Sequence, residues 1–590
     1  MTAPLPEPRR LLNFAMLLGL AWLVVVAQLL ADHWAETVQT LSDMDDAMRL
    51  VQVREFVASA GWFDLHESRL GPPDGYDTHW SRLIDAGLAG LFLLFNAFTD
   101  GALAERLMRT VWPMLWLIPA MVGAAAIAWR IAGRPAALIA LLFAAVGLPA
   151  FQHFIPGRID HHNVQIALSV LLISAAAWSD RVAWAAAAAG ALTGGAMAIG
   201  FESLPYVVLC GAALALRFIA DPAGARALGQ YGIYAAAAIV LAFLVSIAPA
   251  HWGGTACDAI AINSVAAAIA GTVGLALSSG MLAGAPWQGR TAGVIASGAV
   301  ASGLFVAIEP HCLAGPFAML DPMVRSIWFN HVSEMQPLWR VSWDSPPMGA
   351  AIAAFPAVAL ACTLAMARQA RRDFGFLVAA AALLIATVVM VTMVRAFSYA
   401  MWLAIPLAAA GALHLAARLR LGTLASRALL VLALTPSVTS AVALAAAQAV
   451  SHGGPVAENS RVTEGCLLSK NYEGLARLPP GLVVTDVDYG PFVLALTPHS
   501  VLSAPYHRLV APIIEAHEIF ALPPDEARAV AEQVKPTYLV VCGRHKLAGI
   551  SDAARAASLW GRLAAGDVPG WLELVGETGG WPIRVYRVHL

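Results

Sequence analysis

Residues 11–31 read LLNFAMLLGLAWLVVVAQLLA and contain no charged side chain. A helix rises about 1.5 Å per residue, so about 20 apolar residues cross the hydrocarbon core of a bilayer. The segment is longer than the apolar core of an ordinary signal peptide, and no evident cleavage site follows it. It therefore predicts a retained transmembrane helix that begins just after Arg9 and Arg10.

Twelve further apolar segments predict an α-helical polytopic membrane protein with about 13 transmembrane helices in total. They cover residues 111–132, 135–151, 164–178, 182–199, 204–218, 231–248, 262–282, 291–308, 350–366, 376–394, 401–416 and 428–449. Of the 590 residues 59% are hydrophobic and only 13% are charged, whereas soluble proteins carry about 25% charged residues. The net charge of -2 leaves no basic surplus for phosphates, which excludes a nucleic-acid partner.

Residues 83–98 form a shorter apolar run, and its placement decides the orientation of every later helix. If this run does not span, the arginines near the helix ends fall on one side, which the positive-inside rule makes the cytoplasm. They are Arg9, Arg10, Arg130, Arg134, Arg181, Arg217, Arg226, Arg290, Arg368, Arg371, Arg372, Arg418, Arg420 and Arg427. We therefore predict a peripheral or re-entrant helix here, within a long first outer loop of residues 32–110. The N-terminus is then cytoplasmic, in the cell (inner) membrane, and residues 309–347 form another large outer loop.

The composition changes near Val450, where charged residues, proline and histidine return. We predict a transmembrane domain over residues 1–449 and a soluble α/β domain over residues 450–590, outside the cytoplasm or in the periplasm. Apolar or β-branched runs predict strands at residues 482–485, 538–542 and 583–588, and residues 524–533 predict a helix.

Six cysteines are present, and Cys210 and Cys362 lie in apolar runs that predict buried thiols. Two pairs fall on the predicted outer side: Cys257 with Cys312, and Cys466 with Cys542. Each pair forms a disulfide only if that face is oxidising, and sequence alone leaves the pairing open.

Three acids, Asp43, Asp45 and Asp46, follow the first helix in the string SDMDDAMRLVQVREF. Neighbouring carboxylates repel one another, and a divalent cation with oxygen ligands relieves that repulsion. The alternative is an ordinary helix N-terminus, where aspartate caps the backbone and favours the helix dipole.

The next outer loop contains PGRIDHHNVQ, with Asp160, His161 and His162. A carboxylate followed two residues later by an imidazole is able to bind a metal. The alternative is a polar interfacial loop, which is common in membrane proteins.

Three more signals lie on the same predicted face. The string NHVSEMQPLW contains Glu334, and Arg395 stands at the end of an apolar helix in MVRAFSYA. An isolated arginine there either snorkels to the headgroups or binds an anion. The string TDVDYG places Asp486 and Asp488 at the end of a predicted strand, a position that aspartate also takes for purely structural reasons.

Weaker candidates stand in the same loops and in the C-terminal domain. They are Asp77, His79 and Arg82 in GYDTHWSRLID, Glu202 in GFESLPY, and His507 with Arg508 in APYHR. Interfacial anchoring around Trp80, or an ordinary protein surface, explains these residues equally well.

With these strings located, the chain resembles the catalytic subunit family of oligosaccharyltransferases, within the GT-C type of membrane glycosyltransferases, as a divergent bacterial-type member. That family has 13 spanning helices, a long first outer loop and a C-terminal outer domain. The order and spacing of the motifs agree along the whole chain. The resemblance thus implies the GT-C fold.

The motifs correspond residue by residue. Asp46 occupies the place of the family's first-loop catalytic aspartate, with Asp45 as the fallback. Asp160 matches the first acid of the family's Asp-x-Glu or Asp-x-Asp motif, and His162 stands in place of the second acid. Glu334 matches the glutamate of the SVSE-type motif. Arg395 matches an arginine that contacts the phosphates of the donor.

VDYG resembles the end of the family's WWDYG motif and puts Asp488 and Tyr489 on the acceptor side. Both tryptophans of that motif, which help to recognise an Asn-x-Ser/Thr acceptor, are replaced by Asp486 and Val487. The donor side of the family pattern is thus better retained than the peptide-acceptor side.

The resemblance implies a transferase that moves a sugar or oligosaccharide from a polyprenyl-phosphate or polyprenyl-diphosphate carrier to an acceptor on the outer face. A divalent cation, Mn or Mg, is then held by Asp46, Asp160, His162 and Glu334, and it stabilises the leaving phosphate together with Arg395. Asp46 also orients or deprotonates the acceptor, which is a protein, a lipid or a glycan.

Two alternatives remain. The first is a transferase that moves one sugar from polyprenyl phosphate to a lipid or polysaccharide, which the missing tryptophans favour. The second is a transporter or flippase, whose ionisable residues usually lie at the bilayer midplane on broken helices. The acids of this chain lie in predicted outer loops, and no repeated halves are evident.

Overall fold

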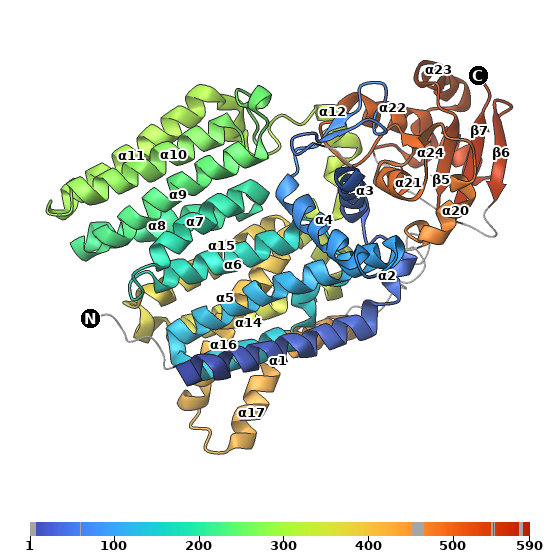
Figure 1. The fold of residues 1–590 in the computed structure, drawn as a ribbon. Helices are drawn as coiled ribbons and strands as arrows, with labels where there is room; N and C mark the ends of the chain where they lie inside the picture. The colour runs from blue at the N-terminus through green and yellow to red at the C-terminus, as the bar shows by residue number, and fades with distance from the viewer. Residues whose placement is uncertain (1–7, 59–60, 451–464, 544–546, 548, 578–581) are drawn as a thin grey trace.

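The computed structural model describes residues 8–58, 61–450, 465–543, 547, 549–577 and 582–590 (Figure 1). A bundle of long helices carries a smaller domain with a β-sheet at one end, and the helices of the first loop lie between the two. This arrangement confirms the predicted class, a polytopic helical protein with a C-terminal α/β domain.

In the described residues, nine helices are long and apolar enough to cross a membrane. They are α1 (Pro8–His33), α5 (Gly101–Ala145), α8 (Leu204–Ala220), α9 (Ala225–Ser246), α10 (Ile262–Met281), α11 (Trp287–Ile308), α14 (Pro346–Ala370), α15 (Phe374–Thr392) and α16 (Phe397–Arg418). Two apolar helices are shorter, α6 (His162–Trp178) and α7 (Ala185–Ile199). The chain is thus a multi-pass membrane protein, and the count of about 13 helices stays a prediction.

Two predicted spans, residues 111–132 and 135–151, meet within the continuous element α5. The element leaves helical geometry at Ala132 and Gly133, where Gly133 has a φ of 77°. Only glycine adopts that conformation at little cost, and Pro135 follows it directly. Two helical segments therefore join there with almost no loop.

The last predicted span, residues 428–449, is broken. It forms α17 (Leu424–Ala433) and α18 (Pro436–Val450), which are bent by 61° relative to each other. Pro436 lacks the N–H group that would continue the helix, and it disfavours helical geometry in the residue before it. Hydropathy detected the apolar length but not the break.

Residues 83–98 form α4 (Arg82–Asn96), a helix of 15 residues that packs on α3 (Met44–Ala58) and α5. The hydroxyl of Ser81 caps α4 by accepting from the Leu83 N–H at 3.4 Å. The helix is shorter than the about 20 residues of a full span. Its depth in a bilayer stays a prediction.

The C-terminal domain contains a five-stranded sheet in the order β4-β3-β5-β7-β6. The three predicted strands are confirmed as β3 (Leu482–Thr485), β5 (Tyr538–Cys542) and β7 (Ile583–Val588), and the predicted helix is α23 (Pro524–Val534). Prediction missed β4 (Ser500–Val501), which has only two residues, and β6 (Leu572–Glu577). Strand β3 is parallel to both β4 and β5, whereas β7 is antiparallel to both neighbours.

Both cysteine pairs that sequence left open are disulfides, Cys257–Cys312 and Cys466–Cys542. The first joins the segment after α9 to η5 (Pro310–Ala314), and the second ends on β5. Cys210 and Cys362 are buried free thiols, as predicted.

The first loop is held between the helices and the C-terminal domain. The Gly71 N–H donates to the Val501 carbonyl at 2.9 Å, and the Val501 N–H donates to the Arg69 carbonyl at 2.8 Å. Arg54, on α3, donates to the Ala495 carbonyl at 2.5 Å. The first loop and the C-terminal domain therefore meet at this end of the bundle.

Candidate active site

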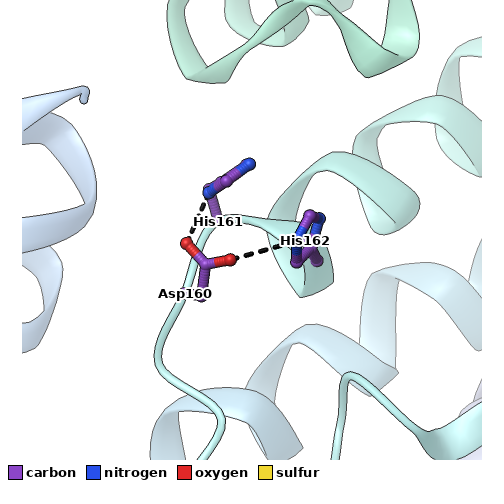
Figure 2. A group of neighbouring side chains, drawn as sticks. All are labelled: Asp160, His161 and His162. Carbon is purple, nitrogen blue, oxygen red and sulfur yellow. Dashed lines mark hydrogen bonds and ion pairs between the residues drawn. The ribbon is translucent and has the colours of Figure 1, made fainter. Parts of the chain in front are cut away.

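The loop before α6 places a carboxylate between two imidazoles (Figure 2). One oxygen of Asp160 pairs with His161 Nδ1, and the other lies 3.1 Å from His162 Nε2. Asp160 is 2% exposed and His162 4% exposed, so both are shielded from water. One potential ligand atom from each of the three residues lies within 4.8 Å of the others, a spacing that suits a metal ion.

Asp46 holds this loop in place. Its Oδ1 accepts from the backbone N–H groups of Ile159 at 2.6 Å and Asp160 at 2.9 Å. Its Oδ2 lies 3.2 Å from Nε of Arg158. Asp43 accepts from the N–H groups of Asp45 and Asp46 at 3.0 Å each, so it caps α3 in the manner of an ordinary helix N-terminus.

Asp45 is close enough to Asp160 for their charges to interact. Burial raises the pKa of Asp45 well above its usual range, and the negative charges of Asp160 and Asp43 raise it further. Arg395 is close enough to oppose that rise. Because the carboxylate of Asp46 is engaged by the loop backbone and Arg158, Asp45 is better placed than Asp46 to meet a ligand.

Arg395 lies on the short turn η8 (Val394–Ala396) between α15 and α16. Its Nε donates to Glu202 at 2.5 Å, its Nη1 to Glu334 at 2.5 Å, and its Nη2 to His162 Nε2 at 2.9 Å. Its side chain is only 19% exposed. The guanidinium therefore faces protein groups instead of snorkelling.

We call these residues the active-site group: Asp45, Asp160, His161, His162, Glu202, Glu334 and Arg395. The structure brings together predicted residues from five separate segments, and their catalytic roles stay predictions. Glu202, a weaker candidate in the sequence, makes more contacts than most of the others. The string GFESLPY carries no local signal of these contacts, because the partners of Glu202 lie far away in the sequence.

Within the active-site group, the pKa values of neighbouring residues are shifted by different causes. Burial opposes ionisation of Asp160, but His161, His162 and Arg49 outweigh it and hold the pKa of Asp160 well below its usual range. Burial instead dominates for His161 and lowers its pKa. At neutral pH, Asp160 is thus a carboxylate and His161 is a neutral imidazole that is able to act as a ligand.

Three of the weaker candidates form a second cluster around Asp258. The carboxylate of Asp258 lies 2.8 Å from Arg508, 3.1 Å from His507 Nε2 and 3.7 Å from His79 Nε2. We call Asp258, His79, His507 and Arg508 the junction cluster, because they join the first loop, the loop after α9 and the C-terminal domain. Burial, aided by Arg508, lowers the pKa of His79 to about 3.

The remaining predicted residues lie elsewhere. Asp77 is exposed and pairs with His66 at 2.9 Å on a small hairpin. Arg82 is buried and pairs with Asp85 at 3.1 Å. Asp488 and Tyr489 lie on the turn η10 (Val487–Tyr489) after β3, and Tyr489 packs into an apolar cluster of the C-terminal domain and first loop.

No protein-family model and no curated protein sequence matches the chain. Solved structures do. An oligosaccharyltransferase from Archaeoglobus fulgidus, tethered with an acceptor peptide that contains the NVT sequon, is 16% identical with a TM-score of 0.67; the match covers 90% of this chain and 69% of that one. The chain has the GT-C fold. The predicted resemblance to oligosaccharyltransferases is thereby confirmed for the fold.

Two further structures with this GT-C fold come from the same organism. The archaeal oligosaccharyltransferase AglB in complex with an inhibitory peptide and a dolichol-phosphate is 15% identical, with a TM-score of 0.64 over 90% of this chain and 70% of that one. The oligosaccharyltransferase in complex with Zn and sulfate is 15% identical, with a TM-score of 0.58 over 89% and 67%. At such identities the likeness establishes the fold.

The residues of this GT-C chain fit a divalent cation. Arg395 donates to His162 Nε2, so that nitrogen carries a lone pair and no proton, and it lies 3.1 Å from Asp160 Oδ2. Asp160 Oδ2 is buried and receives no hydrogen bond from the described residues. Two acceptors repel at this distance, whereas two ligands about 2.1 Å from one cation stand about 3 Å apart. Mixed imidazole and carboxylate donors suit Zn or Mn, and carboxylates also suit Mg.

Proposed function

We propose that this chain is a membrane glycosyltransferase that moves a sugar or oligosaccharide from a polyprenyl-phosphate or polyprenyl-diphosphate carrier to an acceptor. One observation carries the proposal: Asp45, Asp160, His162 and Arg395 converge at one end of a bundle with the GT-C fold. The apolar tail of such a donor lies along the helices. Its phosphate and sugar then lie at the end of the bundle, beside the C-terminal domain.

Asp45, Asp160 and His162 would hold the divalent cation, with Glu334 beside them. Bound there, the cation supplies a Lewis acid that stabilises negative charge on the departing phosphate. We assign to Asp45 the catalytic role predicted for Asp46, because Asp46 is hydrogen-bonded to the loop that carries Asp160. The remaining oxygen of Asp45 orients the acceptor or takes its proton.

Arg395 binds the phosphate of the donor. Its planar guanidinium offers several N–H donors to a ligand, and their geometry matches the oxygens of a phosphate. One of its partners in this structure, Glu334, has a side chain that is 41% exposed to water. A phosphate is therefore able to replace Glu334 as a partner of Arg395 without uncovering a buried carboxylate. Glu334 is then free to turn towards the cation.

The orientation in the membrane is part of the proposal. Two disulfides lie in the loops and the domain at the end of the bundle that carries the group. Disulfides persist in oxidising compartments, and the arginines that follow the positive-inside rule lie in other loops. We therefore place the N-terminus in the cytoplasm, and the active-site group and C-terminal domain outside it.

A second candidate differs only in the acceptor. Asp486 and Val487 stand where the resemblance expects two tryptophans, and the Asp486 carboxylate caps the turn η10 by accepting from the Asp488 N–H at 3.1 Å. Small polar and aliphatic side chains do not rebuild an aromatic pocket for a peptide hydroxyl. This favours transfer of a single sugar from polyprenyl phosphate to a lipid or polysaccharide.

The test uses the full chain in detergent with lipid-linked sugars extracted from the membranes of its host. Mass spectrometry follows loss of the lipid-linked donor with Mn, with Mg and with EDTA. We expect metal-dependent loss that Asp45→Asn and Asp160→Asn abolish and that Asp525→Asn, an exposed substitution on α23, retains. A folded protein that consumes no donor from an extract containing lipid-linked sugars would contradict the proposal. The mass of the product identifies the acceptor.

A further inference from the structure

Glu202 stands at the centre of the active-site group and reaches both sides of it. The residue lies on η2 (Phe201–Ser203), the turn between α7 and α8. Its Oε1 accepts from Arg395 Nε at 2.5 Å, and its Oε2 accepts from His162 Nδ1 at 3.2 Å. The Tyr399 hydroxyl donates to Oε2 at 3.0 Å. In the amide orientation that satisfies both of its ends, Gln165 also donates to Oε2, at 3.1 Å.

These four donors come from three different helices or turns; three of them bond to Oε2, and Arg395 bonds to Oε1. A carboxylate has about four lone-pair directions on its two oxygens. Oε2 is therefore fully occupied in this arrangement, and Oε1 is held by the guanidinium of Arg395. Its influence on a bound ion passes through the groups that it holds.

The bond to His162 decides which nitrogen of that imidazole faces the rest of the group. A neutral imidazole carries one proton, and the hydrogen bond at one nitrogen selects the tautomer. The proton on Nδ1 points to Glu202, so Nε2 keeps its lone pair. In this structure that lone pair accepts from Arg395 Nη2 at 2.9 Å, and it is available to a cation once the arginine turns to a phosphate. Nε2 is the atom that lies 3.1 Å from Asp160 Oδ2, the buried oxygen that receives no hydrogen bond from the described residues. Carboxylates placed behind ligand histidines in this way tune metal sites.

Neighbouring residues hold the side chain of Glu202 in position. A Cβ atom on Gly200 would lie only 2.0 Å from the side-chain amide of Gln165, so the small residue there lets that amide reach the turn. The ring of Tyr399 stacks on Tyr206 with centroids 5.5 Å apart, which holds its hydroxyl toward the carboxylate. Both contacts restrain the rotamer of Glu202 without touching His162.

We propose that Glu202 is a positioning residue that fixes His162 as a ligand through Nε2, and that it is not itself a ligand. The inference rests on the cation of the proposed function, but not on glycosyl transfer. It predicts that loss of Glu202 weakens the cation site while the set of atoms bound to the ion stays the same.

The experiment uses the full chain in detergent and Zn²⁺ alone as the probe, measured by isothermal titration calorimetry. Glu202→Gln keeps the shape of the side chain and removes its charge. We expect the Zn²⁺ affinity to fall about 10- to 100-fold, the range found when such a partner of a ligand histidine is removed. The control is Glu105→Gln, whose carboxylate is equally shielded, at 20% against 19% exposed, and pairs with Arg54; it should leave the affinity unchanged.

X-ray absorption at the zinc edge separates a positioning residue from a ligand. The Glu202→Gln protein should show the same number of nitrogen and oxygen neighbours as the wild type. Loss of one oxygen neighbour would show that Glu202 is a ligand and would overturn the proposal, as would an unchanged affinity or a wild-type protein that binds no Zn²⁺. Zn²⁺ binding without sugar transfer would count against the proposed function alone.

Tyr399→Phe provides a second variant that leaves every charge in place. It removes one hydrogen bond to Glu202, whose net worth corresponds to a change of about 2- to 10-fold. We expect the Zn²⁺ affinity to fall by that smaller factor, with a far-ultraviolet spectrum like that of the wild type. If Glu202→Gln does not fold, an unchanged affinity in Tyr399→Phe overturns the inference.

Discussion

The active-site group and the junction cluster contain the same kinds of side chain and lie at the same end of the molecule, yet their charges are balanced differently. In the junction cluster one carboxylate, Asp258, faces Arg508, His507 and His79. In the active-site group four carboxylates lie near one arginine, Arg395, and two histidines, and Arg49 approaches Asp160 only to 4.0 Å while it bonds to Asp85.

The difference separates a structural contact from a binding site. A buried carboxylate that meets basic partners is satisfied, and its pKa is lowered, as for Asp258. A partly buried carboxylate among other carboxylates has a raised pKa, as for Asp45, whereas Asp160, beside His161 and His162, has a lowered one. Proteins accept such repulsion between carboxylates where a ligand relieves it. Residue type alone therefore does not distinguish the two clusters, whereas the charges around Asp45 do.

The largest expected effect separates the two clusters by activity. Asp160→Asn removes a buried carboxylate of the active-site group, and we expect consumption of the lipid-linked donor to fall at least about 100-fold, as when a charge-stabilising group is lost. Asp258→Asn should retain consumption within about 10-fold, measured on folded protein at saturating metal, because a tenfold change corresponds to about 1.4 kcal/mol. Equal losses in both variants would remove the distinction.

Metal removal should affect only the active-site group. EDTA removes the divalent cation, so we expect donor consumption to fall to background. Added Mn²⁺ should restore consumption, because the carboxylates of the active-site group would again hold a cation. Mn²⁺ at about 100 times its dissociation constant should also raise the unfolding free energy by about 2.7 kcal/mol, seen as a higher midpoint in thermal melts. Asp160→Asn should lose that rise and Asp258→Asn should keep it.

Stability without metal should change in opposite directions. Asp258→Asn leaves Arg508 and two histidines without their anion, and we expect the unfolding free energy to fall by about 1 kcal/mol, because Arg508 is 36% exposed and stays hydrated. Asp45→Asn removes a charge that its neighbours repel, and it should leave the melting midpoint unchanged or higher in EDTA. Thermal melts of both variants check this, and a strong loss of stability in Asp45→Asn would contradict the assigned repulsion.

The smallest expected effect concerns pH. The folded chain keeps His79 neutral down to about pH 3, whereas an unfolded histidine takes up a proton near pH 6.5. The unfolded state therefore binds more protons between these values, and stability falls as the pH drops through this window. His79→Gln should flatten the decline of the melting midpoint between pH 7 and pH 4. A decline as steep as in the wild type would show that His79 does not titrate as proposed.

Hydropathy and residue patterns predicted most of the fold, because long apolar helices and β-branched strands leave strong local signals. The predicted range 262–282 lies within one residue of α10, and the three predicted strands match β3, β5 and β7 in full. The join at Gly133 falls between the predicted ranges 111–132 and 135–151, but the break before Pro436 was missed, although proline is a known helix breaker. Averaging hydropathy over about 20 residues cannot resolve a break of two.

The candidate site was predictable only in part. Motif order pointed to Asp160, His162, Glu334 and Arg395, and the structure places all four together. The choice between Asp45 and Asp46 was not available from sequence, because neighbouring residues on a helix point about 100° apart and the phase of the helix is unknown.

The central position of Glu202 was not predicted from the sequence, for a different reason. Its partners His162, Arg395 and Tyr399 stand 40, 193 and 197 residues away, so no local pattern connects them. Tyr399 also lies at the start of an apolar helix, where a tyrosine reads as an interfacial anchor. Contacts of this range become visible only when the helices are packed.

The most direct test of the account is the number of divalent ions that bind to the chain. Isothermal titration calorimetry with Mn²⁺ and Zn²⁺ on the full chain in detergent should show one ion per chain. That binding should disappear in Asp160→Asn and persist in Asp258→Asn. A chain that binds no divalent ion, or that loses it only in Asp258→Asn, would contradict the claim that the excess of carboxylates at Asp45 and Asp160 serves a cation.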